Sequence, residues 1–141
     1  MSFARQASIP VLLAFVTACG GSASEPANPS VAAGQRLQGD WRLLSFQPAL
    51  ALEEPLQGLL DAQQKTLVIR FANGEFTAAG LGVNTSGRYE ITSAAGDTLT
   101  GRIFDRSGAG YGISGQFITN QFRFVSSDSP WAGTGVLERA Q

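Results

Sequence analysis

The sequence predicts an all-β fold, a single antiparallel up-and-down barrel or half-barrel of about eight short strands. Turn signals recur at short spacing from residue 37 onward, and the segments between them alternate apolar and polar residues. In Thr98–Phe104, for example, Leu99, Gly101 and Ile103 share one face. The chain has 141 residues, which fits one domain with one core. A sandwich of two sheets would satisfy the same pattern, so closure stays open at this point.

The strands are predicted in an order set by the turns between them. They are Trp41–Phe46, Leu67–Phe71, Glu75–Ala79, Arg88–Thr92, Thr98–Phe104, Tyr111–Ile118, Gln121–Val125 and Gly133–Arg139. Asn73-Gly74, between the second and third, is a strong hairpin signal, because both residues tolerate a positive φ. Gly101, Gly112 and Gly115 fall inside strand patterns and indicate bulges or the tight bends of a barrel.

One short amphipathic helix is predicted between the first two strands. In the segment Glu53–Gln64, Leu56, Leu59 and Leu60 stand at positions i, i+3 and i+4, which puts them on one helix face. We expect this apolar stripe to pack on the sheet or to cover one end of a barrel. The adjacent carboxylates Glu53 and Glu54 fit a helix start better than a cation site, because neighbouring helical residues do not face each other.

The N-terminal segment has the layout of a secretory signal. Arg5 precedes the apolar run Ile9–Val16, and small residues lead into the single cysteine, Cys19. Val16-Thr17-Ala18-Cys19 resembles the lipobox of bacterial lipoproteins. The resemblance implies cleavage after residue 18 and a diacylglycerol on the Cys19 sulfur. A retained segment with a free thiol and a plain secreted product are the alternatives.

These features divide the chain into three parts: a signal peptide (1–18), a lipidated flexible tether (19–36) and a β domain (37–141). The tether region is rich in Gly, Ser, Pro and Ala and lacks large apolar residues. Gly20 follows the cysteine where enterobacterial lipoproteins kept at the inner membrane tend to have Asp. We therefore expect a lipid-anchored protein of the cell envelope, at the outer membrane.

Composition excludes several functions. With 10 basic and 11 acidic residues, the net charge is −1, so the chain lacks the excess of positive charge that is typical of nucleic-acid-binding proteins. The chain has no histidine, and its one cysteine is assigned to the anchor, so His-based triads, thiol nucleophiles and Cys/His zinc sites are excluded. We expect a monomer that is not an enzyme and takes no metal or cofactor.

The start of the β domain resembles the lipocalins and their relatives, the calycins. Gly39-Asp40-Trp41 is similar to the Gly-x-Trp motif that opens their first strand. The resemblance implies that Trp41 closes one end of a barrel and that an arginine near the chain end, Arg139, packs over its ring. The META-type domain of bacterial heat-shock lipoproteins also begins with Gly-x-Trp, but its Cys-Asn element is missing here.

The predicted function is the binding of a small apolar or lipid-like ligand in the barrel mouth. The candidate lining residues are Phe71, Phe76, Ile103 and Phe117. The alternative is a structural or interaction lipoprotein whose barrel is filled by its own side chains, since an eight-stranded barrel is just wide enough for either. A cavity above about 300 Å³ favours the ligand. Four arginines on strands are expected to face solvent: Arg70, Arg88, Arg102 and Arg123.

Overall fold

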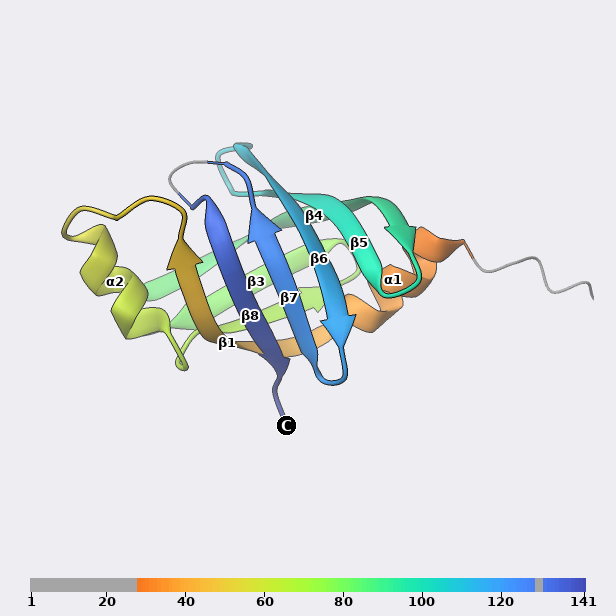
Figure 1. The fold of residues 1–141 in the computed structure, drawn as a ribbon, viewed down its shortest axis with the longest axis horizontal. Coiled ribbons are helices and arrows are strands. Elements are labelled where there is room, and N and C mark those ends of the chain that lie inside the picture. The colour runs from red at the N-terminus through yellow and green to blue at the C-terminus, as the bar shows by residue number, and fades with distance from the viewer. Residues whose placement is uncertain (1–27, 129–130) are drawn as a thin grey trace, which may run out of the picture.

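The computed structural model describes residues 28–128 and 131–141 and shows a closed barrel of eight antiparallel strands with a helix at each end (Figure 1). The elements are α1 (Pro29–Leu37), β1 (Gly39–Pro48), α2 (Leu56–Gln63), β2 (Val68–Ala72), β3 (Glu75–Gly80), β4 (Val83–Ala95), β5 (Thr98–Phe104), β6 (Gly110–Ile118), β7 (Gln121–Ser126) and β8 (Gly133–Arg139). Each strand pairs with the next, and β8 pairs with β1.

The predicted β fold is confirmed, and closure is settled in favour of the barrel. Because β1 pairs with both β2 and β8, the half-barrel and the two-sheet sandwich are wrong. The strand predicted at Arg88–Thr92 is much longer, since β4 extends in both directions from it. Its extra residues are small or polar and carried little strand signal in the sequence.

The connections differ between the two ends of the barrel. At the end near α1, β2–β3, β4–β5 and β6–β7 are joined by two-residue turns. Asn73 and Gly74 in the first of these have φ angles of 52° and 83°, as a type I′ hairpin requires. At the other end, β3 and β4 are also joined by a two-residue turn, but the remaining connections are longer, including the one that carries α2. The first end is therefore tightly closed, whereas the second has room for additional structure.

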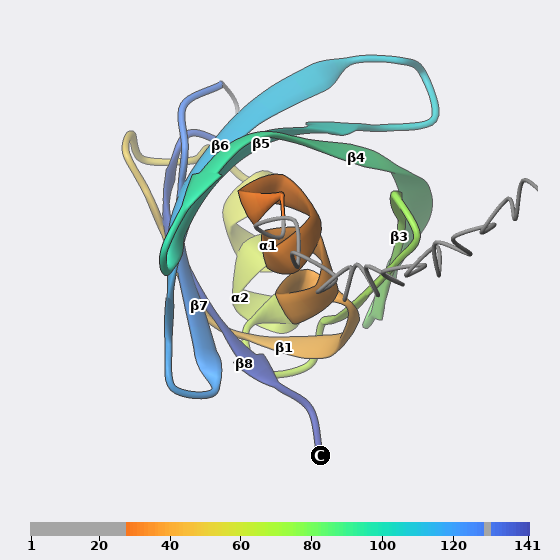
Figure 2. The same cartoon turned by 90° about the vertical axis from the view of Figure 1, so that its right-hand side faces the viewer.

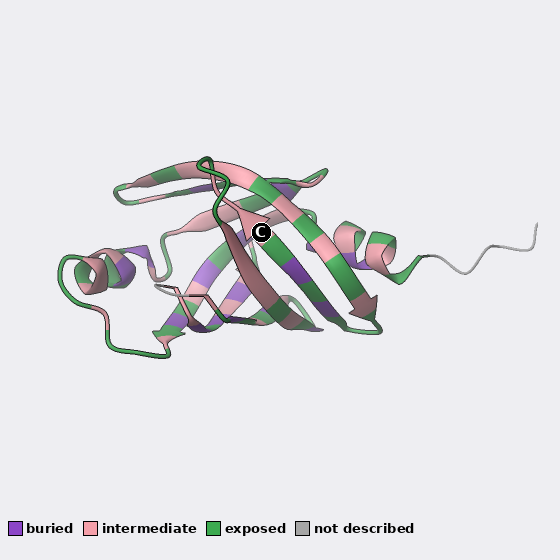
Figure 3. Cartoon of the chain, turned by 90° about the horizontal axis from the view of Figure 1, so that it is seen from above, coloured by how far each residue is buried: buried purple, intermediate pink, exposed green. Residues whose placement is uncertain are grey.

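Alternation along the strands separates the core from the solvent face. Buried and exposed residues alternate along several strands, as in β3 and β5 (Figure 3). Two inward-facing glycines make room for aromatic rings of the core. A Cβ on Gly115 would lie 2.3 Å from the Phe122 ring, and one on Gly135 would lie 2.3 Å from the Phe124 ring. Glycine is thus required where these rings cross the neighbouring strand.

Helix α1 corrects the predicted tether over 19–36, because residues 29–36 are helical and pack on β4 and β5. Viewed from this end of the barrel, α1 lies inside the ring of strands (Figure 2). The side chain of Asn28 caps the helix by accepting a hydrogen bond from Ser30 N at 3.0 Å. The buried face of α1 consists of Ala33 and Leu37. Cys19 and the predicted signal peptide lie outside the described residues.

Helix α2 confirms the predicted helix between the first two strands. It is shorter than predicted, because Pro55 is the N-cap residue and Glu53 and Glu54 precede the helix. It covers the end of the barrel opposite α1 (Figure 1). Within residues 28–128 and 131–141, neither helix has the length and apolar character needed to cross a bilayer.

Candidate functional site

A cavity of about 350 Å³ lies inside the barrel beneath α2. Its walls come from α2, from all eight strands and from the segments next to them. The lining residues are Leu43, Phe46, Leu59, Leu60, Gln63, Leu67, Ile69, Phe71, Ala78, Val83, Thr85, Ile103, Tyr111, Ile113, Phe122, Phe124, Ser126, Trp131 and Leu137. The volume is at the lower end of the range for small-molecule sites, about 300–1,000 Å³. The prediction of a barrel filled by its own side chains is therefore not favoured.

The chemistry of this wall is apolar and uncharged. None of its residues is Asp, Glu, Lys or Arg, and only five carry polar side-chain groups: Gln63, Thr85, Tyr111, Ser126 and Trp131, the last through its indole N–H. Transfer of apolar surface into such a space gains about 25 cal/mol per Å² removed from water. The arrangement suits retention of an apolar molecule and offers no acid–base pair for catalysis.

Helix α2 is held over the cavity by polar contacts of its last turn. Nε2 of Gln63 donates to the carbonyl oxygen of Leu81 in the β3–β4 turn. Oε1 of the same amide is buried and has no hydrogen-bond partner in the described part of the chain. Gly80 permits this placement, since a Cβ there would collide with Oε1. The backbone N–H of Lys65 donates to Leu43 O at 2.6 Å and joins the segment after α2 to β1.

Two of the four predicted ligand-lining residues, Phe71 and Ile103, line the cavity. Phe76 and Phe117 do not line it. Phe76 is buried against Phe71, with ring centroids 6.4 Å apart. Phe117 lies near the α1 end, where the guanidinium carbon of Arg36 is 4.3 Å from its ring centroid. Alternation predicts which residues face inward, but not how far along the barrel axis each one lies.

Several lining residues were missed by the sequence analysis. Phe124 carried a usable signal, because it alternates with Phe122 on the inner face of the predicted strand. Ser126 continues the same alternation, but a serine at a strand end looks like the start of a loop. Trp131 follows this loop and packs against Phe46, with ring centroids 6.5 Å apart. Nothing in its local sequence places it over a cavity.

The structure brings Gly39, Trp41 and Arg139 together at the α1 end. Trp41 is 1% exposed, and its Nε1 donates to Leu37 O at 2.7 Å. The guanidinium carbon of Arg139 lies 4.4 Å from the Trp41 ring centroid. Gly39 has a φ of +110°, and a Cβ there would lie 3.0 Å from Nη1 of Arg139. Glycine therefore allows both the backbone turn and the close approach of the guanidinium.

The same arginine also joins the barrel to α1. Nη1 of Arg139 donates to Gln38 O at 2.9 Å, and Nη2 donates to Arg36 O at 2.5 Å. Because Trp41 and Arg139 are directly paired on β1 and β8, this contact joins the first strand to the last. The arrangement closes the barrel and stabilises its end, and it leaves the α2 end as the accessible one.

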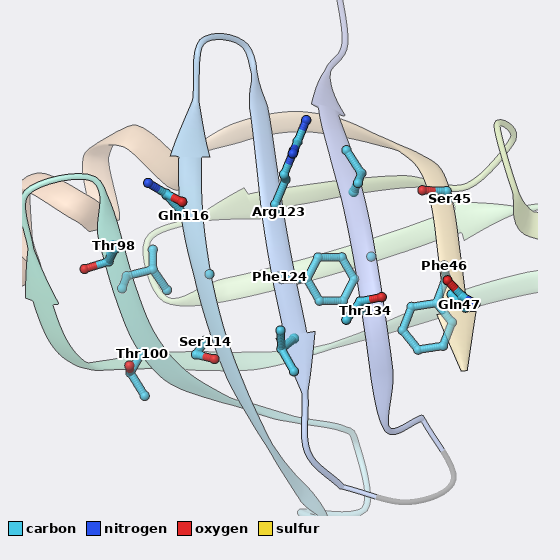
Figure 4. Close-up of a pocket in the computed structure, with 15 residues that line it drawn as sticks. Ser45, Phe46, Gln47, Thr98, Thr100, Ser114, Gln116, Arg123, Phe124 and Thr134 are labelled. Atoms are coloured by element: carbon cyan, nitrogen blue, oxygen red, sulfur yellow. The ribbon is translucent and has the colours of Figure 1, made fainter. Parts of the chain in front are cut away.

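A second, larger hollow of about 670 Å³ lies on the outer face of β5, β6, β7, β8 and β1. Figure 4 shows side chains from these strands around it, among them Thr98, Ser114, Gln116 and Thr134. These residues are exposed, so the hollow is open to solvent. An open depression on the outside of the sheet removes little ligand surface from water. The smaller interior cavity is the better binding site on physical grounds.

The four strand arginines that were expected to face solvent lie outside the barrel. Arg70, Arg88, Arg102 and Arg123 are all exposed, as predicted. Arg70 pairs with Asp40, with Nε to Oδ1 at 2.6 Å and Nη2 to Oδ2 at 2.9 Å. This hydrogen-bonded arginine lowers the pKa of the Asp40 carboxyl. Among the described residues, no group of three acidic, histidine or cysteine side chains is placed to hold a metal ion.

Comparison with known protein families, with curated proteins and with solved structures finds no match to this chain. What the cavity does is therefore inferred from its own residues.

Proposed function

We propose that this protein binds a small apolar or lipid-like molecule inside the barrel while a lipid anchor holds it at a membrane. The observation that carries the first part is the interior cavity of about 350 Å³, whose wall bears no charge. At about 30 Å³ for each water-sized group, such a space takes on the order of a dozen non-hydrogen atoms. A single medium-length chain or one small ring system is of this size.

The resemblance to lipocalins supports the same function by analogy. Fold alone does not determine function, so the analogy has less weight than the cavity itself. The alternative, a barrel without a ligand that acts as a structural or interaction module, needs a filled interior. The free volume beneath α2 argues against it.

Filling the cavity tests the ligand hypothesis. Ala78 is 6% exposed and lines the cavity, whereas its neighbour Ala79 points outward on the same strand. We expect Ala78→Leu to weaken binding of 1-decanol at least about tenfold, because three added carbons occupy the ligand space. Ala79→Leu is the matched control and leaves binding unchanged. Titration calorimetry measures both, and absence of binding to the unaltered chain would refute the proposal.

The anchor is proposed from Cys19 and the residues before it. Cys19 lies nine positions before Asn28, so at most about 30 Å of chain separates the anchored sulfur from the start of α1. Since α1 and α2 are at opposite ends of the barrel, the anchor joins at the end remote from the cavity (Figure 1). Taken together, the two proposals orient the cavity away from the membrane.

Replacement of the cysteine tests the anchor directly. We expect Cys19→Ala to release the protein from the membrane fraction, because no acyl chain is then attached to provide membrane affinity. The measurement is fractionation of cells that produce each form, with mass spectrometry of the purified protein for the acyl groups. A Cys19→Ala protein that still sediments with membranes would contradict the proposal.

A further inference from the structure

The polar groups of the cavity restrict which molecules it accepts. Of the four amide and hydroxyl side chains, three are engaged or peripheral, and the fifth polar group, the indole N–H of Trp131, belongs to a half-buried ring and can only donate. Gln63 donates to Leu81 O, and its free oxygen is covered by protein. The Tyr111 hydroxyl lies 3.5 Å from Oδ2 of Asp105, in the turn after β5. Thr85 is only half-buried, near the start of β4.

Ser126 is different from these three. Ser126 is 7% exposed, and its position in the alternation of β7 places it on the inward face with Phe122 and Phe124. Its hydroxyl forms no hydrogen bond with any other side chain or backbone group in the described ranges 28–128 and 131–141, and its residue lines the cavity. A hydroxyl of a cavity-lining residue that has no partner among these residues is a ready hydrogen-bonding site for a ligand.

Charge at this end of the barrel works against anions. The segments around α2 and the neighbouring loops are more acidic than basic. The acidic residues are Glu53, Glu54, Asp61, Asp105 and Asp128, and the basic ones are Lys65 and Arg106. An ionised carboxylate would approach an acidic rim and would then be buried without a cation, which is strongly unfavourable.

From these observations we propose that the cavity selects an uncharged single-chain amphiphile with a hydroxyl head group, and that the head group exchanges hydrogen bonds with Ser126. This inference rests on the proposed function and narrows it to one ligand class. A hydroxyl both donates and accepts, as the serine does. An ether only accepts, and a carboxylate adds a charge that the wall cannot neutralise.

The test compares three ligands of nearly equal length: 1-decanol, decanoate and 1-methoxydecane. Binding to the full chain is measured by titration calorimetry and by the fluorescence of Trp131, which lines the cavity. At pH 7.5 we expect 1-decanol to bind at least about tenfold more tightly than decanoate. Decanoate affinity rises as the pH falls to about 4.5, close to the ordinary pKa of a carboxylic acid, because its neutral form accumulates.

Substitution of the serine provides the second measurement. Ser126→Ala weakens 1-decanol about five- to tenfold, the loss of its hydrogen bonds with the serine, and weakens 1-methoxydecane by about threefold or less, because the ether can only accept from the serine hydroxyl. Val125→Ala, on the outward face of the same strand, is the matched control and changes neither ligand. Circular dichroism at each pH verifies that the barrel is folded.

The outcomes separate this inference from the proposed function. If none of the three ligands binds, both fail. If decanoate binds at pH 7.5 as tightly as 1-decanol, or if Ser126→Ala weakens the alcohol and the ether equally, the ligand class is wrong although the cavity binds apolar molecules.

Discussion

The two ends of this barrel are built from the same strands but are packed in opposite ways. At the α1 end, Trp41, Phe117 and Phe122 meet with ring centroids 4.9 to 6.4 Å apart. Helix α1 adds Leu37 to this cluster, and Arg139 covers it. At the α2 end, aromatic rings such as Phe46 and Trp131 alternate with small inward residues such as Ala78 and Ser126, and a cavity of about 350 Å³ remains.

This difference shows how one small barrel provides both stability and space. The aromatic end buries large surfaces and is closed by two-residue turns, so it supplies much of the folding free energy. The α2 end gives up part of that packing to keep its interior open. Because the domain has no disulfides, tight packing at the α1 end has to compensate for the packing that the cavity at the α2 end removes.

The two tryptophans allow the largest test of this comparison, since one lies at each end. We expect Trp41→Ala to cost about 3–5 kcal/mol of unfolding free energy, because the most buried ring of the core is lost. Trp131→Ala removes a half-buried ring and costs about 1–2 kcal/mol, but it weakens ligand binding. Urea unfolding followed by circular dichroism measures the first effect, and calorimetry measures the second.

If Trp41→Ala fails to fold, Trp41→Phe takes its place in the comparison with Trp131→Ala. The phenylalanine keeps part of the packing, so the free energy of unfolding can still be measured. Equal losses of stability for the Trp41 and Trp131 variants would show that the two ends do not differ. Unchanged ligand affinity in Trp131→Ala would show that this tryptophan does not contribute to binding.

The second test concerns the arginine that covers the aromatic end. Arg139→Ala should cost about 1–2 kcal/mol, since it removes a cation–π contact and two hydrogen bonds to the segment that leads from α1. Arg123→Ala on the outer face is the control and should stay within about 0.5 kcal/mol. Urea unfolding compares the two. If the two variants lose equal stability, Arg139 does not hold this end together.

The sequence predicted the strands well because alternation and turn residues are local signals. Thr98–Phe104 and Gly133–Arg139 were predicted with the observed bounds. Helix α1 was missed because most of its residues are small or polar and only Val31 and Leu37 are larger apolar residues. Such a helix is stabilised by tertiary contact with β4 and β5, where Ala33 and Leu37 are buried, and not by a long apolar stripe of its own.

The site was predicted less completely than the fold for a related reason. Alternation predicted that Phe71 and Phe117 both face inward, but their distance from α2 depends on strand register around the closed barrel. The contact of Trp41 with Arg139 was expected from a family resemblance and not from any local pattern. The cavity itself depends on the sizes of side chains that come from every strand, which no single segment reveals.

The smallest expected effect compares one carboxylate at each end. Arg70 lowers the pKa of Asp40 near α1, and hydrogen bonds led by the Ser107 hydroxyl lower the pKa of Asp105 near α2. A carboxylate with a lowered pKa in the folded state stabilises the protein above its unfolded pKa, about 3.9 for Asp, and this stabilisation is lost as the pH falls through the folded pKa.

We therefore expect the free energy of unfolding to be flat from pH 7 to about 5 and to fall below about pH 4. Because both groups are partly open to solvent, Asp40→Asn and Asp105→Asn should each flatten the acid limb only slightly in urea unfolding series from pH 7 to 3. Since the turn at Asp105 is next to the cavity, Asp105→Asn alone should also alter 1-decanol binding. The two ends would be electrostatically equivalent if Asp40→Asn altered binding to the same extent.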